Sequence, residues 1–178
     1  MPLPALVIVG GAPGTGKTRL ANMLAEAIGC PAISRDRMKE GMVLARGGAF
    51  RAATDDALTR ETFPLFFRVI ALLLEGGVTV IAEAAFQDKL WRIGLEPLLP
   101  LARPRIIHCR ASDDVARRRR RERAQDDATR AAHADADPAV VMPSEFAELS
   151  LAAPAIVVDT TDGYMPAFDE IVRFARGG

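Results

Sequence analysis

Residues 11–18 carry the most specific chemical pattern in the chain. They are Gly-Ala-Pro-Gly-Thr-Gly-Lys-Thr, a full match to the P-loop pattern G-x-x-x-x-G-K-[ST]. Glycines let backbone amides approach an anion without a Cβ in the way, and the start of the following helix adds positive potential. We expect Lys17 to contact the β- and γ-phosphates of a nucleoside triphosphate and Thr18 to bind Mg²⁺. The nucleotide contacts expected from this pattern are Gly11, Pro13, Gly14, Thr15, Gly16, Lys17 and Thr18.

Two acidic residues follow strands that the sequence predicts. Asp36 comes shortly after the apolar residues 32–33, and Glu83 ends the apolar run 78–82. A carboxylate at the carboxyl end of a strand, near the expected phosphate site, can orient and deprotonate an alcohol, or hold a water bound to Mg²⁺. The alternatives are that Asp36 stabilises the first turn of a helix and that Glu83 is a solvated acid at a strand end.

The elements that would position these residues alternate between strand and helix. Ligands of such a sheet bind beyond the carboxyl ends of its strands. The pattern predicts an α/β fold of three layers, α/β/α, with a five-stranded and mostly parallel sheet. The expected strands are 5–9, 32–33, 78–82, 105–109 and 155–158. The first expected helix follows the P-loop and ends at residue 28. The other expected helices cover 34–45, 54–75 in two pieces broken near Pro64, 88–101, 112–127, 144–151 and 165–175.

Length and composition limit the classes of protein that the chain can belong to. Its 178 residues, 49% of them hydrophobic, fit a single domain over 1–178. The 23 basic and 23 acidic residues balance, so no overall field attracts nucleic acid or a membrane. The two cysteines lack a metal-binding or disulfide pattern, and no leader or membrane span is expected, which favours a reduced, cytoplasmic protein.

An arginine cluster covers residues 117–121 and 123. Taken alone, such a run is typical of a solvated helix face or a nucleic-acid patch. Arg119 and Arg123 are four residues apart and therefore share one face of a helix. Their neighbours Arg118, Arg120 and Arg121 are expected to face solvent.

The P-loop, Ile33-Ser34-Arg35-Asp36, Ala82-Glu83-Ala84 and the arginine-rich helix together resemble small P-loop kinases of the chloramphenicol phosphotransferase and polynucleotide kinase type. The resemblance covers nearly the whole chain. It implies that Asp36 takes the proton of the acceptor hydroxyl and that a lid at about 117–143 closes Arg119 and Arg123 over the phosphates. Lys39 matches a basic position near the acceptor, although arginine is usual there.

Further contacts are expected around these groups. The loop after the last strand lies against adenine in related kinases, which makes Thr160 and Thr161 candidate base contacts, unless they only form a turn. The metal site would combine Thr18 and Glu83. Candidate contacts with the acceptor are Arg35, Lys39, Glu83, Phe86, Arg130 and His133.

These features predict a phosphotransferase that uses ATP and Mg²⁺ and acts on a hydroxyl of a small molecule. An apolar wall from residues such as Met38, Met42, Leu58, Phe63, Phe66 and Phe67 would favour a drug-like or nucleoside-like acceptor, an antibiotic among them. One alternative is a kinase of polynucleotide or nucleoside 5′-hydroxyls, which the neutral charge balance disfavours for polynucleotides. Another is a nucleotide-gated binding protein without transferase activity. No pattern indicates an oligomeric state.

Overall fold

The computed structural model describes residues 2–46, 57–86, 88–126 and 149–178. Its five strands are β1 (Ala5–Gly10), β2 (Ala32–Ser34), β3 (Val80–Glu83), β4 (Arg103–Arg110) and β5 (Ala155–Asp159). They form one sheet in the order β2-β3-β1-β4-β5, and all four neighbouring pairs are parallel. The predicted α/β fold is confirmed, with a sheet that is parallel throughout.

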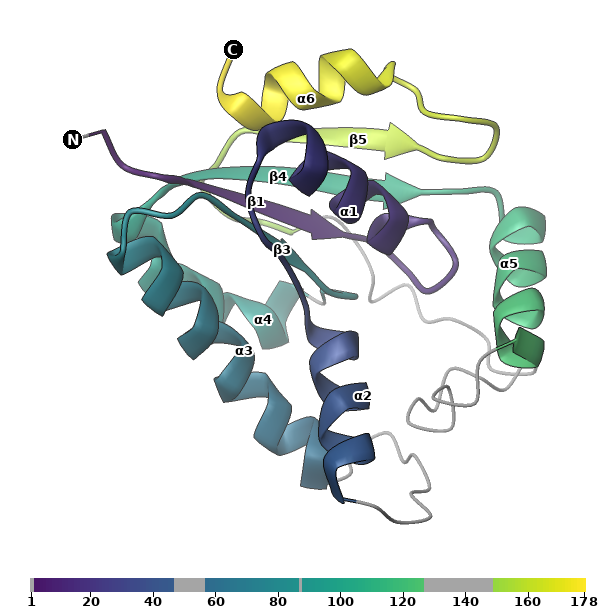
Figure 1. Cartoon of the computed structure of the whole chain (residues 1–178). Coiled ribbons are helices and arrows are strands. Elements are labelled where there is room, and N and C mark those ends of the chain that lie inside the picture. The colour runs from purple at the N-terminus through teal and green to yellow at the C-terminus, as the bar shows by residue number, and fades with distance from the viewer. Residues whose placement is uncertain (1, 47–56, 87, 127–148) are drawn as a thin grey trace.

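Helices cover both faces of this sheet. They are α1 (Lys17–Ile28), α2 (Arg35–Arg46), α3 (Ala57–Glu75), α4 (Asp88–Leu95), α5 (Asp113–Asp126) and α6 (Phe168–Arg176), with a 3₁₀ turn at Glu96–Leu101. In Figure 1, α1 and α6 lie on one face and α3 and α4 on the other, while α5 stands beyond the carboxyl end of β4. The described part of the chain contains no helix long and apolar enough to cross a membrane.

The core is divided between the two faces because side chains alternate along a strand. Every residue of β1 is buried. Leu6 and Ile8 pack toward α3 and α4, whereas Val7 and Val9 pack toward α1 and α6. A strand covered on both faces must be apolar throughout, which explains why this run was easily predicted.

Pro64 does not divide its helix as the sequence predicts. α3 is one helix of 19 residues with Pro64 inside it. Proline removes one backbone hydrogen bond, but the helix buries Leu58 and Thr62 before this position and Phe66 and Ile70 after it. Packing of one continuous face against the sheet therefore outweighs the lost bond.

Other boundaries also differ from the prediction. The helix expected over 88–101 ends at Leu95 and continues as the 3₁₀ turn, which contains two prolines. The last helix begins at Phe168, two residues after Pro166, rather than at residue 165. Residues 144–148 of the expected helix 144–151 lie outside the described residues, and 149–151 are not helical.

Strand register brings the carboxyl ends of the central strands together. Val9 pairs with Glu83, Glu83 pairs with Ser34, and Gly10 pairs with His108. The loop after β1, the acid that ends β3 and the start of α2 therefore meet at one edge of the sheet.

Candidate active site

The loop between β1 and α1 is shaped by glycines in conformations that other residues rarely adopt. Gly11, Gly14 and Gly16 have φ values of 140°, 93° and 75°. A Cβ on Gly14 would stand 2.5 Å from the carbonyl oxygen of Ala116 in α5, and one on Gly11 would collide with the carbonyl of Cys109. The glycines therefore fit the loop tightly between β4 and α5.

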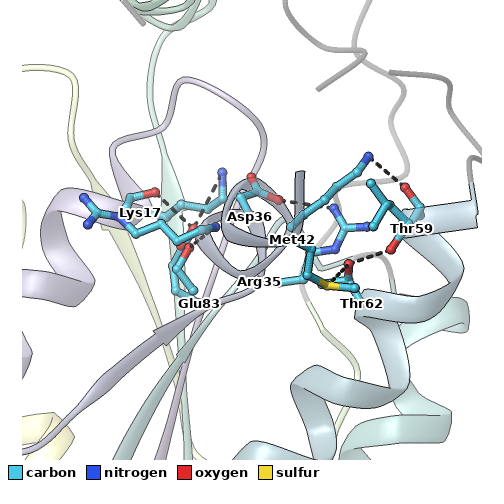
Figure 2. A network of polar contacts seen from close by, with 12 residues as sticks. Lys17, Arg35, Asp36, Met42, Thr59, Thr62 and Glu83 are labelled. Carbon is cyan, nitrogen blue, oxygen red and sulfur yellow. Dashed lines mark hydrogen bonds and ion pairs between the residues drawn. The ribbon is translucent and has the colours of Figure 1, made fainter. Parts of the chain in front are cut away.

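Lys17, Thr18 and Glu83 form a polar group beneath this loop. Lys17 and Glu83 are 5% and 1% exposed, and 4.0 Å separates Lys17 Nζ from Glu83 Oε1. The Thr18 hydroxyl donates a hydrogen bond to the same oxygen over 3.2 Å. Figure 2 shows Lys17 and Glu83 facing each other, with Asp36 nearby.

Burial dominates the ionisation of Glu83. Loss of solvent raises the pKa of this carboxyl above its usual range, and the negative charge of Asp36 adds to the rise. The positive charge of Lys17 and the hydroxyls of Ser34 and Thr18 lower the pKa without cancelling the effect of burial. The surroundings of Glu83 therefore disfavour the charged form of its carboxyl group.

The residues present fit a magnesium-bound nucleotide. Glu83 Oε2 is buried and has no hydrogen-bond partner among the described residues. Mg²⁺ prefers oxygen ligands and is commonly held by one or two side chains together with phosphates of the substrate. Thr18 and Glu83 supply such oxygens. No group of three or more His, Cys, Asp or Glu side chains in the described ranges could hold a metal by itself.

Asp36 stands in the first turn of α2 and lines the same cavity as the P-loop. Its Oδ1 lies 3.2 Å from Nη1 of Arg35, which is itself mostly buried. About a third of the Asp36 side chain, 30%, remains exposed. Arg35 therefore holds the carboxylate in place while leaving part of it accessible.

A cavity of about 1150 Å³ is shared by Lys17, Thr18 and Asp36, whereas Arg35 and Glu83 are not in its described lining. It runs from the P-loop along α1 and α2 to α5 and the loop after β5. On the side of α2, its wall is mainly polar. The described lining comprises Pro13, Gly14, Gly16, Lys17, Thr18, Arg19, Asn22, Met23, Glu26, Ser34, Asp36, Arg37, Glu40, Gly41, Leu44, Arg119, Glu122, Arg123, Thr160, Gly163 and Tyr164.

Two arginines of α5 line this cavity. Arg119 donates to Thr160 from two nitrogens, and Arg123 Nε donates to the carbonyl of Arg119 over 3.3 Å. Arg118 and Arg121 are exposed as expected. Arg120 departs from the expectation, because the side chain is half-buried and its Nε and Nη1 are buried without hydrogen-bond partners among the described residues.

Several predicted site residues lie away from the cavity lining. Gly11 and Thr15 shape the P-loop from within, where the Thr15 hydroxyl donates to the Ala12 carbonyl over 2.8 Å. The Thr161 hydroxyl accepts from the Ser112 amide. Arg130, His133 and most of the proposed lid at 117–143 lie outside the described residues.

Lys39 and Phe86 are placed inside the protein. The Lys39 ammonium donates to Thr59 over 2.9 Å, so it joins α2 to α3. Phe86 is 2% exposed and packs its ring against Trp91, with centroids 4.8 Å apart. Aromatic side chains bury a large apolar area, which explains why Phe86 is drawn into the core rather than to the cavity.

The apolar side chains expected to form an acceptor wall also lie in the core or pack against other parts of the protein. Leu58, Phe66 and Phe67 are buried, while Met38 and Phe63 pack against the same core cluster. The Thr62 hydroxyl contacts Met42 at its sulfur atom (Figure 2). None of these side chains belongs to the described lining of the cavity.

The polar face of α2 was not among the site residues predicted from the sequence. Arg37, Glu40, Gly41 and Leu44 line the cavity beside Asp36. Residues 36, 40 and 44 are four apart and therefore share one helix face, so their spacing was a usable signal once Asp36 had been singled out.

Comparison with known proteins places the chain in a family. A model of AAA_33, an AAA domain, matches residues 6–143. A protein from Chloroflexus aurantiacus, to which kinase activity is ascribed, shares 30% sequence identity, with 99% of this chain and 96% of that chain covered and a TM-score of 0.80. The search of curated proteins gave no match.

Two more distant structures share the fold. A sugar kinase from Janibacter is 16% identical with a TM-score of 0.68, and 98% of this chain and 95% of that chain are covered. The APS kinase of Mycobacterium tuberculosis, in complex with AMPPNP and APS, is 14% identical with a TM-score of 0.65 and coverage of 97% and 95%. The P-loop lies in the expected strand-loop-helix setting, and the family model matches most of this chain. The chain therefore belongs to the AAA_33 family of AAA domains.

Proposed function

We propose that this protein is an ATP- and Mg²⁺-dependent phosphotransferase that moves the γ-phosphoryl group to a hydroxyl of a polar small molecule, with residues 1–178 acting as one domain. The observation that supports this most strongly is the shared cavity. Lys17 of the P-loop and Asp36 of α2 line the same space, so a phosphate donor and an acid for the acceptor face each other.

The comparisons support a kinase and do not identify its acceptor. The Chloroflexus relative carries a kinase description and aligns with nearly the whole chain. The sugar kinase and the APS kinase contribute the fold alone, which many reactions can share. The main support for the reaction is therefore the site of this chain, and the Chloroflexus relative adds to it.

The proposed mechanism assigns one task to each group. The acceptor oxygen attacks the γ-phosphorus, the bond from that phosphorus to the β,γ-bridging oxygen breaks, and ADP leaves. Asp36 orients the hydroxyl and receives its proton as the new bond forms. Lys17, Arg119 and Arg123 stabilise negative charge on the phosphoryl oxygens. Bound Mg²⁺, held on the side of Thr18 and Glu83, would supply further positive charge at the phosphates.

The charged side chains on the α2 side of the cavity favour a polar acceptor. Beyond Asp36, α2 presents Arg37 and Glu40, with Leu44 as its apolar member. This wall suits a molecule rich in hydroxyl or charged groups better than a largely apolar drug, and an antibiotic acceptor gains no support. The particular likeness to chloramphenicol phosphotransferases and polynucleotide kinases rests on sequence motifs alone.

A polynucleotide acceptor is disfavoured by the acids of the cavity. Four of them, Glu26, Asp36, Glu40 and Glu122, line it together with its arginines. A channel for a phosphate backbone is normally continuous in positive charge, because that backbone carries one negative charge per nucleotide. The mixed charges of this cavity favour a small acceptor.

Mass spectrometry after incubation with Mg·ATP tests the proposal. The acceptor panel contains sugars, polyols and nucleosides, together with chloramphenicol and an oligonucleotide bearing a 5′-hydroxyl. We expect one phosphoryl group on a polar small molecule, and no product from Lys17→Ala. Product only on the oligonucleotide or on chloramphenicol would contradict the acceptor class. Nucleotide binding without any product would favour a nucleotide-gated binding protein.

A further inference from the structure

Thr160 connects three parts of the site through its hydrogen bonds. It follows β5 directly and is 3% exposed. Its hydroxyl donates to the carbonyl of Thr15 in the P-loop over 2.8 Å and accepts from Arg119 Nη1 over 3.0 Å. Its carbonyl accepts from Arg119 Nη2 over 2.7 Å. The P-loop, α5 and the loop after β5 therefore meet at one residue.

The two contacts with Arg119 restrict the guanidinium strongly. A guanidinium bound through both terminal nitrogens is fixed in orientation as well as in position, because its donors form a rigid planar fork. The group is held beside the P-loop, since a Cβ built on Gly16 would lie 3.6 Å from Arg119 Nη1. A free arginine would have to give up many rotamers before contacting a phosphate, whereas this one has already lost them.

The same contacts leave Thr160 no hydrogen-bond donor for the base contact expected from the sequence. A threonine hydroxyl has one proton, and here that proton is donated to Thr15. The backbone amide of Thr160 donates to the carbonyl of Arg110 over 2.9 Å. Both hydrogen-bond donors of Thr160 are therefore directed into the protein.

We propose that Thr160 is a positioning residue, whose hydroxyl and carbonyl hold the Arg119 guanidinium at the terminal phosphoryl of bound ATP and tie it to the P-loop. The inference rests on the proposed function, because it needs a triphosphate at this loop. Preorganised donors are most effective where charge must be stabilised without rearrangement. Thr160 would thus act through Arg119, without a direct contact from its hydroxyl to the nucleotide.

Calorimetric titration with Mg·AMPPNP and Mg·ADP separates this role from a general structural one. We expect Thr160→Val to weaken Mg·AMPPNP binding about tenfold and Mg·ADP binding less than about twofold, because a lost hydrogen bond to a charged group corresponds to roughly that factor. Thr160→Ser restores the hydroxyl and should bind both nucleotides like the unaltered protein. The selective loss arises because only AMPPNP carries the terminal phosphoryl.

Three further variants make the test specific. Arg119→Ala should show the same selective loss, and the double variant Arg119→Ala with Thr160→Val should be no weaker than Arg119→Ala alone. Thr79→Val is the matched control, because the Thr79 hydroxyl accepts from the Ala5 amide at the opposite end of the sheet. Melting curves check folding, and Thr160→Ala replaces the valine variant if that variant is unfolded.

The outcomes distinguish this inference from the proposed function. Equal affinities of Thr160→Val and the unaltered protein for Mg·AMPPNP would overturn the inference while leaving nucleotide binding intact. Equal weakening of both nucleotides, or additive losses in the double variant, would also overturn it by showing a role independent of Arg119. Failure of the unaltered protein to bind either nucleotide would contradict the proposed function itself.

Discussion

The phosphate side and the acceptor side of the cavity are built in different ways. On the phosphate side, Lys17 and Glu83 are almost fully buried, and Gly14 fits against the backbone of α5. On the proposed acceptor side, the described wall comes from α2, whose residue Leu44 is 67% exposed. The first side is fixed by strands and close packing, and the second by side chains on a partly exposed surface.

This difference shows which part of the function a sequence can reveal. Phosphate binding uses backbone amides and requires glycine at certain positions, so it leaves a short and specific motif. Acceptor choice uses a few side chains that the core does not constrain, so many combinations are compatible with one fold. Substitutions on the two sides should therefore affect different measured quantities.

Lys17→Ala should have the largest effect. Removing the ammonium leaves the terminal phosphates without their buried cation, so we expect affinity for Mg·ATP to fall by roughly a hundredfold or more. Calorimetry measures this directly. An affinity close to that of the unaltered protein would show that the Lys17 ammonium does not bind the terminal phosphates.

Asp36→Asn should separate binding from turnover. The amide keeps the shape of the side chain but accepts a proton poorly, so turnover should fall about a hundredfold, as expected when a general base is lost. Affinity for Mg·AMPPNP should stay within about threefold, because Asp36 lies on the acceptor side. Equal turnover in the two proteins would remove Asp36 from the proposed mechanism.

Arg37→Ala should act on the acceptor alone. This exposed residue lines the cavity, so its loss should raise KM for the acceptor about tenfold and leave affinity for Mg·AMPPNP unchanged. Arg46→Ala is the matched control on the same helix, because Arg46 pairs with Glu61 and is not in the described lining. Equal effects of the two substitutions on KM would argue against an acceptor contact at Arg37.

Glu83→Gln should have the smallest effect, on stability. Burial raises the pKa of Glu83, so between its unfolded and folded pKa values the native state binds more protons than the unfolded state. The free energy of unfolding therefore falls as pH rises through this interval. Without nucleotide, Glu83→Gln should melt at a higher temperature than the unaltered protein at pH 7, and the difference should close below about pH 4.

Two observations complete that test. The same variant should bind Mg·ATP more weakly, because the carboxylate no longer faces the metal side of the nucleotide. A lower melting temperature for Glu83→Gln at pH 7 would mean that the attraction of Lys17 outweighs the cost of burial.

The strands and the P-loop were predictable because their patterns are local. The run at 5–9 is apolar throughout, and the P-loop from Gly11 to Thr18 begins after the single residue Gly10. The continuity of α3 through Pro64 was not predictable, because it depends on contacts with side chains distant in sequence. The polar wall of α2 was only partly hidden, because the spacing of residues 36, 40 and 44 was a local signal, whereas the place of this helix face beside the cavity follows from the folded protein.

Arg119 and Thr160 illustrate the same limit within the site. The family resemblance placed both residues at the nucleotide, but their hydrogen bonds to each other join segments 41 residues apart. Spacing in the sequence carries no sign of that contact. Its consequence, an arginine already oriented beside the P-loop, is a property of the folded protein.

The decisive experiment follows an isotopically labelled γ-phosphoryl group from ATP to a polar hydroxyl compound. We expect a labelled phosphate ester that forms with the unaltered protein, is absent with Lys17→Ala and forms about a hundredfold more slowly with Asp36→Asn. Tight binding of Mg·ATP with no labelled ester from any polar acceptor, or an ester formed equally fast by Asp36→Asn, would contradict this expectation.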